Sequence, residues 1–117
     1  MNVKTKPDTK VEELKIIPAE WIVDYLVRSG AEYICFNNLV VCDKGFLTFV
    51  IKDNVLLVSD CYGDGRFWIK FLDLVARENN CSIIRFGTKR NWRAFNRRFG
   101  FRLIEEKDGY FVLEKEV

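Results

Sequence analysis

The stretch from residue 55 to residue 79 constrains the fold more than any other part of the chain. Its first part, VLLVSD, is too short for a helix and follows the turn residues Asp53-Asn54, so it predicts a strand buried on both faces. Its last part, RFWIKFLDLVAREN, has apolar residues at three- and four-residue spacing, which predicts an amphipathic helix. The segment CYGDG joins the two, so the stretch predicts a strand, a glycine loop and a helix.

This junction is also a candidate binding site. The first backbone N–H groups of a helix have no partner within it, and they point with the positive end of the helix dipole toward the preceding loop. A phosphate group is a natural ligand for such a loop, and Gly63 and Gly65 would let the backbone approach it closely. The alternative is that the two glycines only make a tight connection between strand and helix.

The composition indicates a single folded domain and excludes several kinds of site. With 117 residues, 49% of them hydrophobic and 15% aromatic, the chain is long and apolar enough to bury a core. It has no histidine, which excludes a Ser-His-Asp or Cys-His nucleophile system, and its four cysteines lack C-x-x-C spacing, so no metal site is expected. We expect reduced cysteines and a cytoplasmic protein, because neither a signal peptide nor an apolar run of membrane-spanning length is recognisable.

The remaining patterns predict an α/β fold, a mixed sheet covered by helices. Residues 1–10 are basic and poor in apolar side chains, so we expect a flexible N-terminal arm ahead of one domain at residues 11–117. A helix is expected from Pro18 to about Gly30, and residues 31–36 fit either a helical turn or a strand. The other expected elements are strands at 11–17, 39–42, 46–51, 55–59, 81–86, 101–106 and 109–114 and helices at 66–79 and 88–99, the last ending at Gly100.

The order β-α-β-β-β-α-β-α-β-β and two local patterns resemble the GNAT superfamily of acyl-CoA N-acetyltransferases. The acyl-CoA loop of that superfamily follows the fourth strand and reads Gln or Arg, x, x, Gly, x, Gly or Ala. Residues 60–65, DCYGDG, match its spacing, although Asp60 replaces the first residue. The second pattern is a helix with an early Asn, followed by Gly-Phe and a hairpin. It is carried here by Asn91, Ala94, Phe95, Phe99, Gly100 and Phe101 and by the segment RLIEEKDGYFVLEKEV.

The resemblance implies an acetyl-CoA site in a V-shaped opening between the fourth and fifth strands. The pantetheine arm would pair with the backbone near Val58 and Ser59, and the helix after the fifth strand would offer Asn91 to the cofactor. The reaction implied is transfer of an acetyl group to an amine of a protein or a small molecule. The pyrophosphate would rest on the N–H groups of Cys61, Tyr62, Gly63, Asp64, Gly65 and Arg66.

The catalytic groups of the superfamily are not carried over. Asn96 stands four residues before the Gly-Phe pair, where the superfamily often has a tyrosine acting as general acid. Tyr62 and Tyr110 are candidate substitutes. The candidate bases Asp53 and Asp60 are explained more simply as turn or loop residues, so no catalytic residue is assigned.

Two acids in the glycine loop favour a different use of the same scaffold. Asp60 and Asp64 would face the pyrophosphate unless their side chains point elsewhere, which would weaken cofactor binding. An inactive GNAT-fold protein with a binding or assembly role is therefore an alternative. Compact proteins of this kind are common in phage and mobile-element genomes, where some are virion components, so a phage origin and a virion location are part of this alternative.

A basic segment suggests a third function. Seven cations and no acid lie between residues 85 and 102, although the net charge of the chain is only +2. In the expected basic helix at 89–98, Arg90, Arg93 and Arg97 share one side, which could hold the 3′-phosphate of CoA, an acidic protein or a nucleic acid. The alternative is a solvated helix face paired with the glutamates that follow. A homodimer through an edge strand is a further candidate assembly, which no residue fixes.

Overall fold

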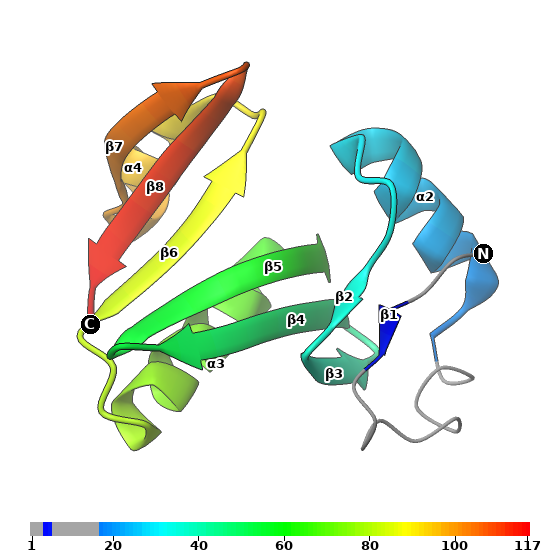
Figure 1. Cartoon of the computed structure of the whole chain (residues 1–117), viewed down its shortest axis with the longest axis horizontal. Helices are drawn as coiled ribbons and strands as arrows, with labels where there is room; N and C mark the ends of the chain where they lie inside the picture. Colours follow the sequence, from blue (N-terminus) through cyan, green and yellow to red (C-terminus); the bar gives the residue numbers. More distant parts are fainter. Residues whose placement is uncertain (1–3, 6–16) are drawn as a thin grey trace.

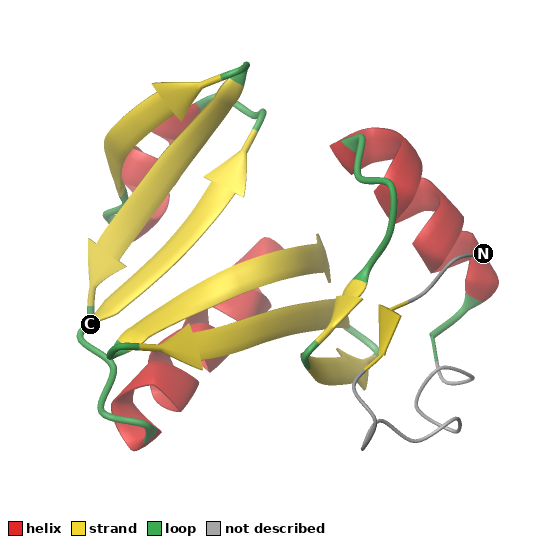
Figure 2. Ribbon diagram, viewed as in Figure 1, coloured by secondary structure: helices red, strands yellow, loops and turns green. Residues whose placement is uncertain are grey.

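The computed structural model of the chain describes residues 4–5 and 17–117, which form a mixed α/β fold around a six-stranded sheet (Figures 1 and 2). The strand order is β3-β4-β5-β6-β8-β7. Within this sheet, β5 and β6 are the only neighbours that run parallel. The strands of this sheet are β3 (Asn38–Cys42), β4 (Gly45–Lys52), β5 (Val55–Gly63), β6 (Ile83–Thr88), β7 (Arg102–Lys107) and β8 (Tyr110–Glu116).

Helices cover both faces of the sheet, and each face has its own core. The helices α3 (Gly65–Glu78) and α4 (Trp92–Phe99) lie on one face of the sheet (Figure 1). There α3 buries Trp68 and Leu72 against the sheet, and the aromatic residues of α4 pack against the same cluster. On the other face α2 (Ala19–Ser29) packs Ile22 next to Phe46 of β4. This arrangement confirms the mixed sheet covered by helices that the sequence predicts.

Several element boundaries also agree with the prediction. The helix α2 begins directly after Pro18 and ends at Gly30, whose φ of 73° is the left-handed cap conformation. Gly100 caps α4 in the same way, with φ of 77°. The ambiguous segment at 31–36 contains a short strand, β2 (Cys35–Phe36), which pairs in parallel with β1 (Lys4–Thr5).

The N-terminal predictions can be compared only in part. Lys4–Thr5 form the strand β1, and the rest of residues 1–10 lies outside the described residues, so the flexible arm stays a prediction. The strand expected at residues 11–17 also lies outside them, except for Ile17, which is buried beside α2.

The predicted strand at 55–59 is too short, and the glycine loop is correspondingly shorter. The ladder between β4 and β5 continues to the pair Gly45 and Gly63, so residues 60–63 belong to the strand. The helix expected at 88–99 starts later, at Trp92, because Gly87 and Thr88 are still paired with β8. Pairing with strands distant in sequence extends β5 and β6 beyond their local patterns, and the cap by Asn91 then sets the start of α4.

The fold opens between β5 and β6, where the strands diverge after a short paired stretch (Figure 1). Val55–Leu57 pair with Ile83–Arg85, and the rest of β5 has no pairing with β6. The far part of β6 instead pairs on its other side with β8. This divergence is the V-shaped opening that the resemblance implies.

Candidate acyl-CoA site

The opening between β5 and β6 contains a cavity of about 650 Å³. Its walls are the far end of β5, the start of α3, the far end of β6 with the loop that follows, and the C-terminal end of α2. Six of the nine cofactor-binding residues predicted from the sequence line it, namely Val58, Ser59, Cys61, Tyr62, Gly63 and Gly65. The other three, Asp64, Arg66 and Asn91, are not part of its lining.

A bulge in β5 sets the direction of the cavity wall. Thr48 of β4 is opposite Asp60 and the next residue, Phe49, is opposite Val58, so Ser59 is the extra residue of a β-bulge. Beyond this bulge β5 remains paired with β4 on one side, while its other edge faces the cavity without pairing to β6. An unpaired strand edge offers backbone N–H and C=O groups to an extended ligand that contains amides.

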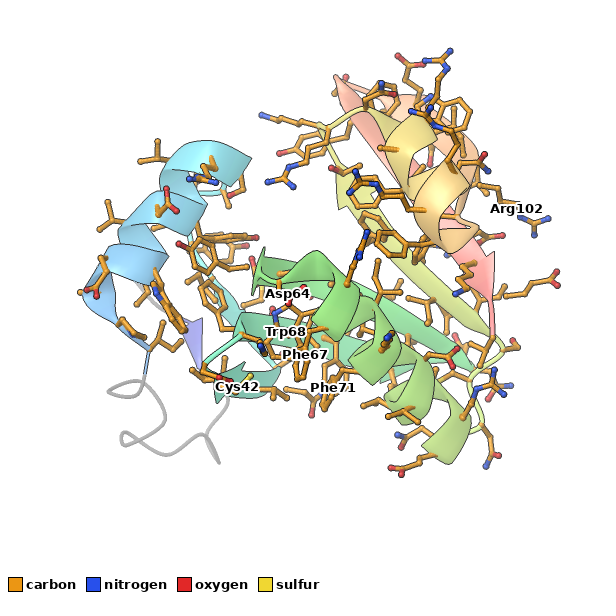
Figure 3. All side chains as sticks on the ribbon, turned by 180° about the vertical axis from the view of Figure 1, so that it is seen from behind. Cys42, Asp64, Phe67, Trp68, Phe71 and Arg102 are labelled. Carbon is orange, nitrogen blue, oxygen red and sulfur yellow. The ribbon has the colours of Figure 1, made fainter. Side chains whose placement is uncertain are left out.

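The turn from β5 into α3 is shaped mainly by contacts within the protein. A Cβ atom on Gly63, which has a φ of 107°, would lie 2.0 Å from the carbonyl oxygen of Lys44, so this glycine permits the close approach of β4. Asp64 caps α3 by accepting a hydrogen bond from the N–H of Phe67 at 3.2 Å (Figure 3). A Cβ on Gly65 would meet no atom within 4 Å, so the space over the helix start is open.

Comparison with known proteins shows similarity to solved structures but not to known sequences. No protein-family model and no curated protein matches the sequence. Two solved structures are similar in fold. An acetyltransferase of the GNAT family from Listeria monocytogenes has a TM-score of 0.58 and 15% identity, over 96% of this chain and 93% of that one. The PaiA N-acetyltransferase from Thermoplasma acidophilum, in complex with coenzyme A, has a TM-score of 0.57 and 16% identity, over 84% of this chain and 70% of that one.

The chain has the fold of the GNAT acetyltransferases. The predicted fold class and the resemblance on which it rests are thereby confirmed. At 15% and 16% identity the comparison concerns the fold alone. The suggested phage or mobile-element origin is supported by neither relative.

Within this GNAT fold, Asp60 connects four elements instead of facing a phosphate. Its buried carboxylate, 4% exposed, accepts hydrogen bonds from the hydroxyl of Tyr25 at 2.5 Å, the N–H of Cys35 at 2.9 Å and the hydroxyl of Thr48 at 2.6 Å. Burial, followed by this hydrogen bond to Asp60, raises the pKa of Tyr25. The prediction that Asp60 is a simple loop residue is wrong, because it is a buried strand residue, and its partners lie 12 to 35 residues away in sequence.

The tyrosines of the cavity differ in how their hydroxyl groups are used. Tyr62 donates a hydrogen bond to Asp24 at 2.7 Å, and Asp24 also pairs with Arg28 at 2.8 Å. The hydrogen bond between Tyr62 and Asp24 raises the pKa of Tyr62 and lowers that of Asp24. Tyr110 lines the cavity with 38% of its surface exposed, and in the described part of the chain its hydroxyl has no hydrogen-bond partner.

The other residues considered for catalysis have structural roles. Asp53 lies in the hairpin between β4 and β5, where it has a φ of 53°, and does not line the cavity. Asn96 donates a side-chain hydrogen bond to the carbonyl of Phe101 at 2.8 Å, which holds the end of α4 against the following strand. Asn91 caps α4 by accepting from the N–H of Arg93 at 3.1 Å.

Positive charge is concentrated on the wall opposite β5. Lys89 and Arg90 follow β6 and line the cavity. Cys61, on β5, is an exposed residue of the cavity lining, and desolvation by the surrounding cavity walls raises the pKa of its thiol to about 12, although the charge of Arg90 lowers it.

Two further findings concern metal-ligating side chains and helix length in the described residues. No group of histidine, cysteine, aspartate and glutamate side chains among them could hold a metal ion, and the four cysteines are free. No helix in the part of the chain that the structure describes is long and apolar enough to cross a bilayer.

Proposed function

We propose that this protein is an acyl-CoA-dependent N-acetyltransferase that transfers an acetyl group from acetyl-CoA to an amine of a small molecule or a protein. The observation that carries the proposal is the cavity between β5 and β6, bounded by the unpaired edge of a bulged strand and by the start of a helix. One structural relative is a coenzyme A complex, which supports the same ligand here.

The pantetheine arm would extend along β5, where the backbone of Val58 and Ser59 is available to its amides. The pyrophosphate would lie over Gly65, near the first N–H groups of α3. Lys89 and Arg90 on the opposite wall would add charge-assisted contacts to phosphate oxygens. Asn91 keeps only its amide N–H groups for the cofactor, since its oxygen caps α4.

The chemistry requires two proton movements. The amine loses a proton as its nitrogen attacks the thioester carbonyl, the carbon–sulfur bond breaks, and the leaving thiolate takes up a proton. Tyr110 is the better of the two candidate proton donors, because Tyr62 already directs its proton to Asp24. The α2 side of the cavity, which includes Tyr33 and Glu32, is the entrance left for the amine.

Ligand-induced stabilisation tests this proposal with a matched pair of variants. Acetyl-CoA at about 100 times its Kd should add about 2.7 kcal/mol to the free energy of unfolding and raise the Tm by roughly 10 °C. Gly65→Glu should remove this shift, because it places a carboxylate at the phosphate position. It should not harm the free protein, because an acidic residue is favourable in the first helical turn.

Gly65→Gln is the control, since it has the same shape without the charge. It should keep more of the shift than Gly65→Glu. Absence of any shift at millimolar acetyl-CoA, or an equal shift in both variants, would contradict cofactor binding at this helix start. Release of free CoA thiol with a panel of primary amines then measures turnover.

An inactive GNAT-fold binding or assembly protein is the second candidate. The carboxylate of Asp64 already occupies one N–H at the start of α3, and Asn96 has a structural role in place of a general acid. Acetyl-CoA binding without thiol release for any amine tested, and without an effect of Tyr110→Phe, would favour this candidate over the enzyme.

A further inference from the structure

Four arginines at the C-terminal side of the cavity have no ionic partner within the described chain. We call this set the α4 cationic surface; it comprises Arg93, Arg97 and Arg98 of α4 and Arg90. The prediction that Arg90 shares a side of the helix with Arg93 and Arg97 is wrong, because α4 begins only at Trp92 and Arg90 lies in the preceding loop. Two other arginines of the basic segment do have an ionic partner, because Arg85 and Arg102 share Glu114 at 2.9 and 3.2 Å. The near-neutral chain therefore has a local excess of positive charge on and beside α4.

The glutamates that follow in sequence do not neutralise this surface. Glu105 and Glu106 of β7 form no ion pair with it, and Glu116 approaches Arg102 instead, at 3.9 Å. In the described chain the arginines of α4 are thus solvent-exposed, as the alternative of a solvated helix face expects, but they form no ion pairs with these acids. The helix nevertheless packs well, since Phe95 and Phe99 turn toward the core and leave the arginines at the surface.

The arrangement of the arginines favours a ligand with several negative charges. Arg93 and Arg97 are one helical turn apart and so lie on the same side of α4. The guanidinium of Arg93 lies 5.0 Å from the ring centroid of Trp92, which orients it while its N–H groups stay available. Arg90 continues the surface to the cavity wall.

We propose that the α4 cationic surface binds the phosphodiester backbone of a nucleic acid. Guanidinium groups match phosphate oxygens in two-point hydrogen bonding, and nucleic-acid interfaces are strongly positive and polar. A protein partner would need apolar anchors at the centre of its interface, and none of the exposed large hydrophobic residues of the described chain lies on α4. Acetyl-CoA does not explain the surface, because Arg93, Arg97 and Arg98 are outside the cavity lining.

Fluorescence anisotropy with labelled duplex DNA and single-stranded RNA of 20 nucleotides tests the proposal at two salt concentrations. Four phosphate contacts predict a slope of about −3.6 for log K against log salt with duplex DNA, hence about 100-fold weaker binding at 200 mM than at 50 mM salt. Arg93→Gln combined with Arg97→Gln should weaken binding about tenfold or more at 50 mM salt and reduce the slope by about 1.8.

The control is Lys52→Gln combined with Lys70→Gln, which removes the same charge from β4 and α3. It should leave binding within about twofold of the unchanged protein, as expected for cations outside the binding surface. Equal losses in both double variants, or no binding at 50 mM salt, would overturn the proposal. Binding of poly-glutamate without binding of either nucleic acid would overturn it in favour of an acidic protein. The acetyl-CoA-induced Tm shift of the Arg93 and Arg97 variant should be unchanged, so the two proposals can fail separately.

Discussion

The two strand-to-helix junctions that frame the cavity share a geometry and differ in charge. At each, a residue with extended backbone caps the helix: Asp64 accepts a hydrogen bond from the N–H of Phe67 and Asn91 from that of Arg93. The cap of α3 is a carboxylate, whereas the cap of α4 is neutral and is preceded by Lys89 and Arg90. Capping thus explains where both helices begin, while charge distinguishes how each junction would receive an anion.

Replacing each glycine of the junction between β5 and α3 by alanine should show which of the two is required for stability. Gly63→Ala should lower the free energy of unfolding by about 2 to 4 kcal/mol, because a left-handed φ and an overlap with the carbonyl of Lys44 both oppose a side chain. Gly65→Ala, two residues later, should be neutral or stabilise by up to about 1 kcal/mol. Urea unfolding of the two variants measures the difference. Equal effects would mean that Gly63 is not required by the approach of β4.

The contact of Asp60 with α2 should be the next largest contribution. Tyr25→Phe removes one of three donors to a buried carboxylate and should cost about 1 to 3 kcal/mol in urea unfolding. Tyr62→Phe, whose partner Asp24 is more exposed and retains Arg28, should cost less.

Tyr25 also predicts how the stability of the protein depends on pH. The pKa of Tyr25 is raised in the folded protein. The contribution of its protonated hydroxyl to the free energy of unfolding is therefore fully present below the ordinary tyrosine pKa of 10.0, and it is lost as the pH rises above that value. The unchanged protein should therefore lose stability more steeply above pH 10.0 than Tyr25→Phe does. Parallel stability curves for the two proteins would show that Tyr25 titrates as it does in the unfolded chain.

The sequence predicted those parts of the molecule that depend on near neighbours. Apolar periodicity identified α3, Pro18 and Gly30 bounded α2, and Gly100 ended α4. The motif DCYGDG located the cavity wall, although its strand extends further than its local pattern indicates.

The errors concern partners that are distant in the sequence. The hydrogen bonds to Asp60 come from three other elements, and the bond between Tyr62 and Asp24 spans 38 residues. No local pattern encodes such pairs. One signal was available: Asp60 continues the apolar run of a strand, where an acid needs buried donors. For Asn91, in contrast, the local sequence is sufficient, because an asparagine directly before a helix predicts an N-cap.

Exchanging the two caps should produce the smallest effects and the most direct test of the charge difference between the junctions. Asp64→Asn keeps a capping oxygen for the N–H of Phe67 and removes a negative charge from the proposed phosphate position. It should tighten acetyl-CoA binding roughly twofold to fivefold, corresponding to about 0.4 to 1 kcal/mol. Asn91→Asp should weaken nucleic-acid binding by a similar factor, because it adds a carboxylate beside Arg90 and Arg93. Calorimetry and anisotropy measure the two affinities, and thermal unfolding should show that both caps still hold.

If Asp64→Asn left acetyl-CoA binding unchanged while Gly65→Glu abolished it, the phosphate would lie over Gly65 but beyond the reach of the capping carboxylate. The charge of the cap would then not distinguish the two junctions.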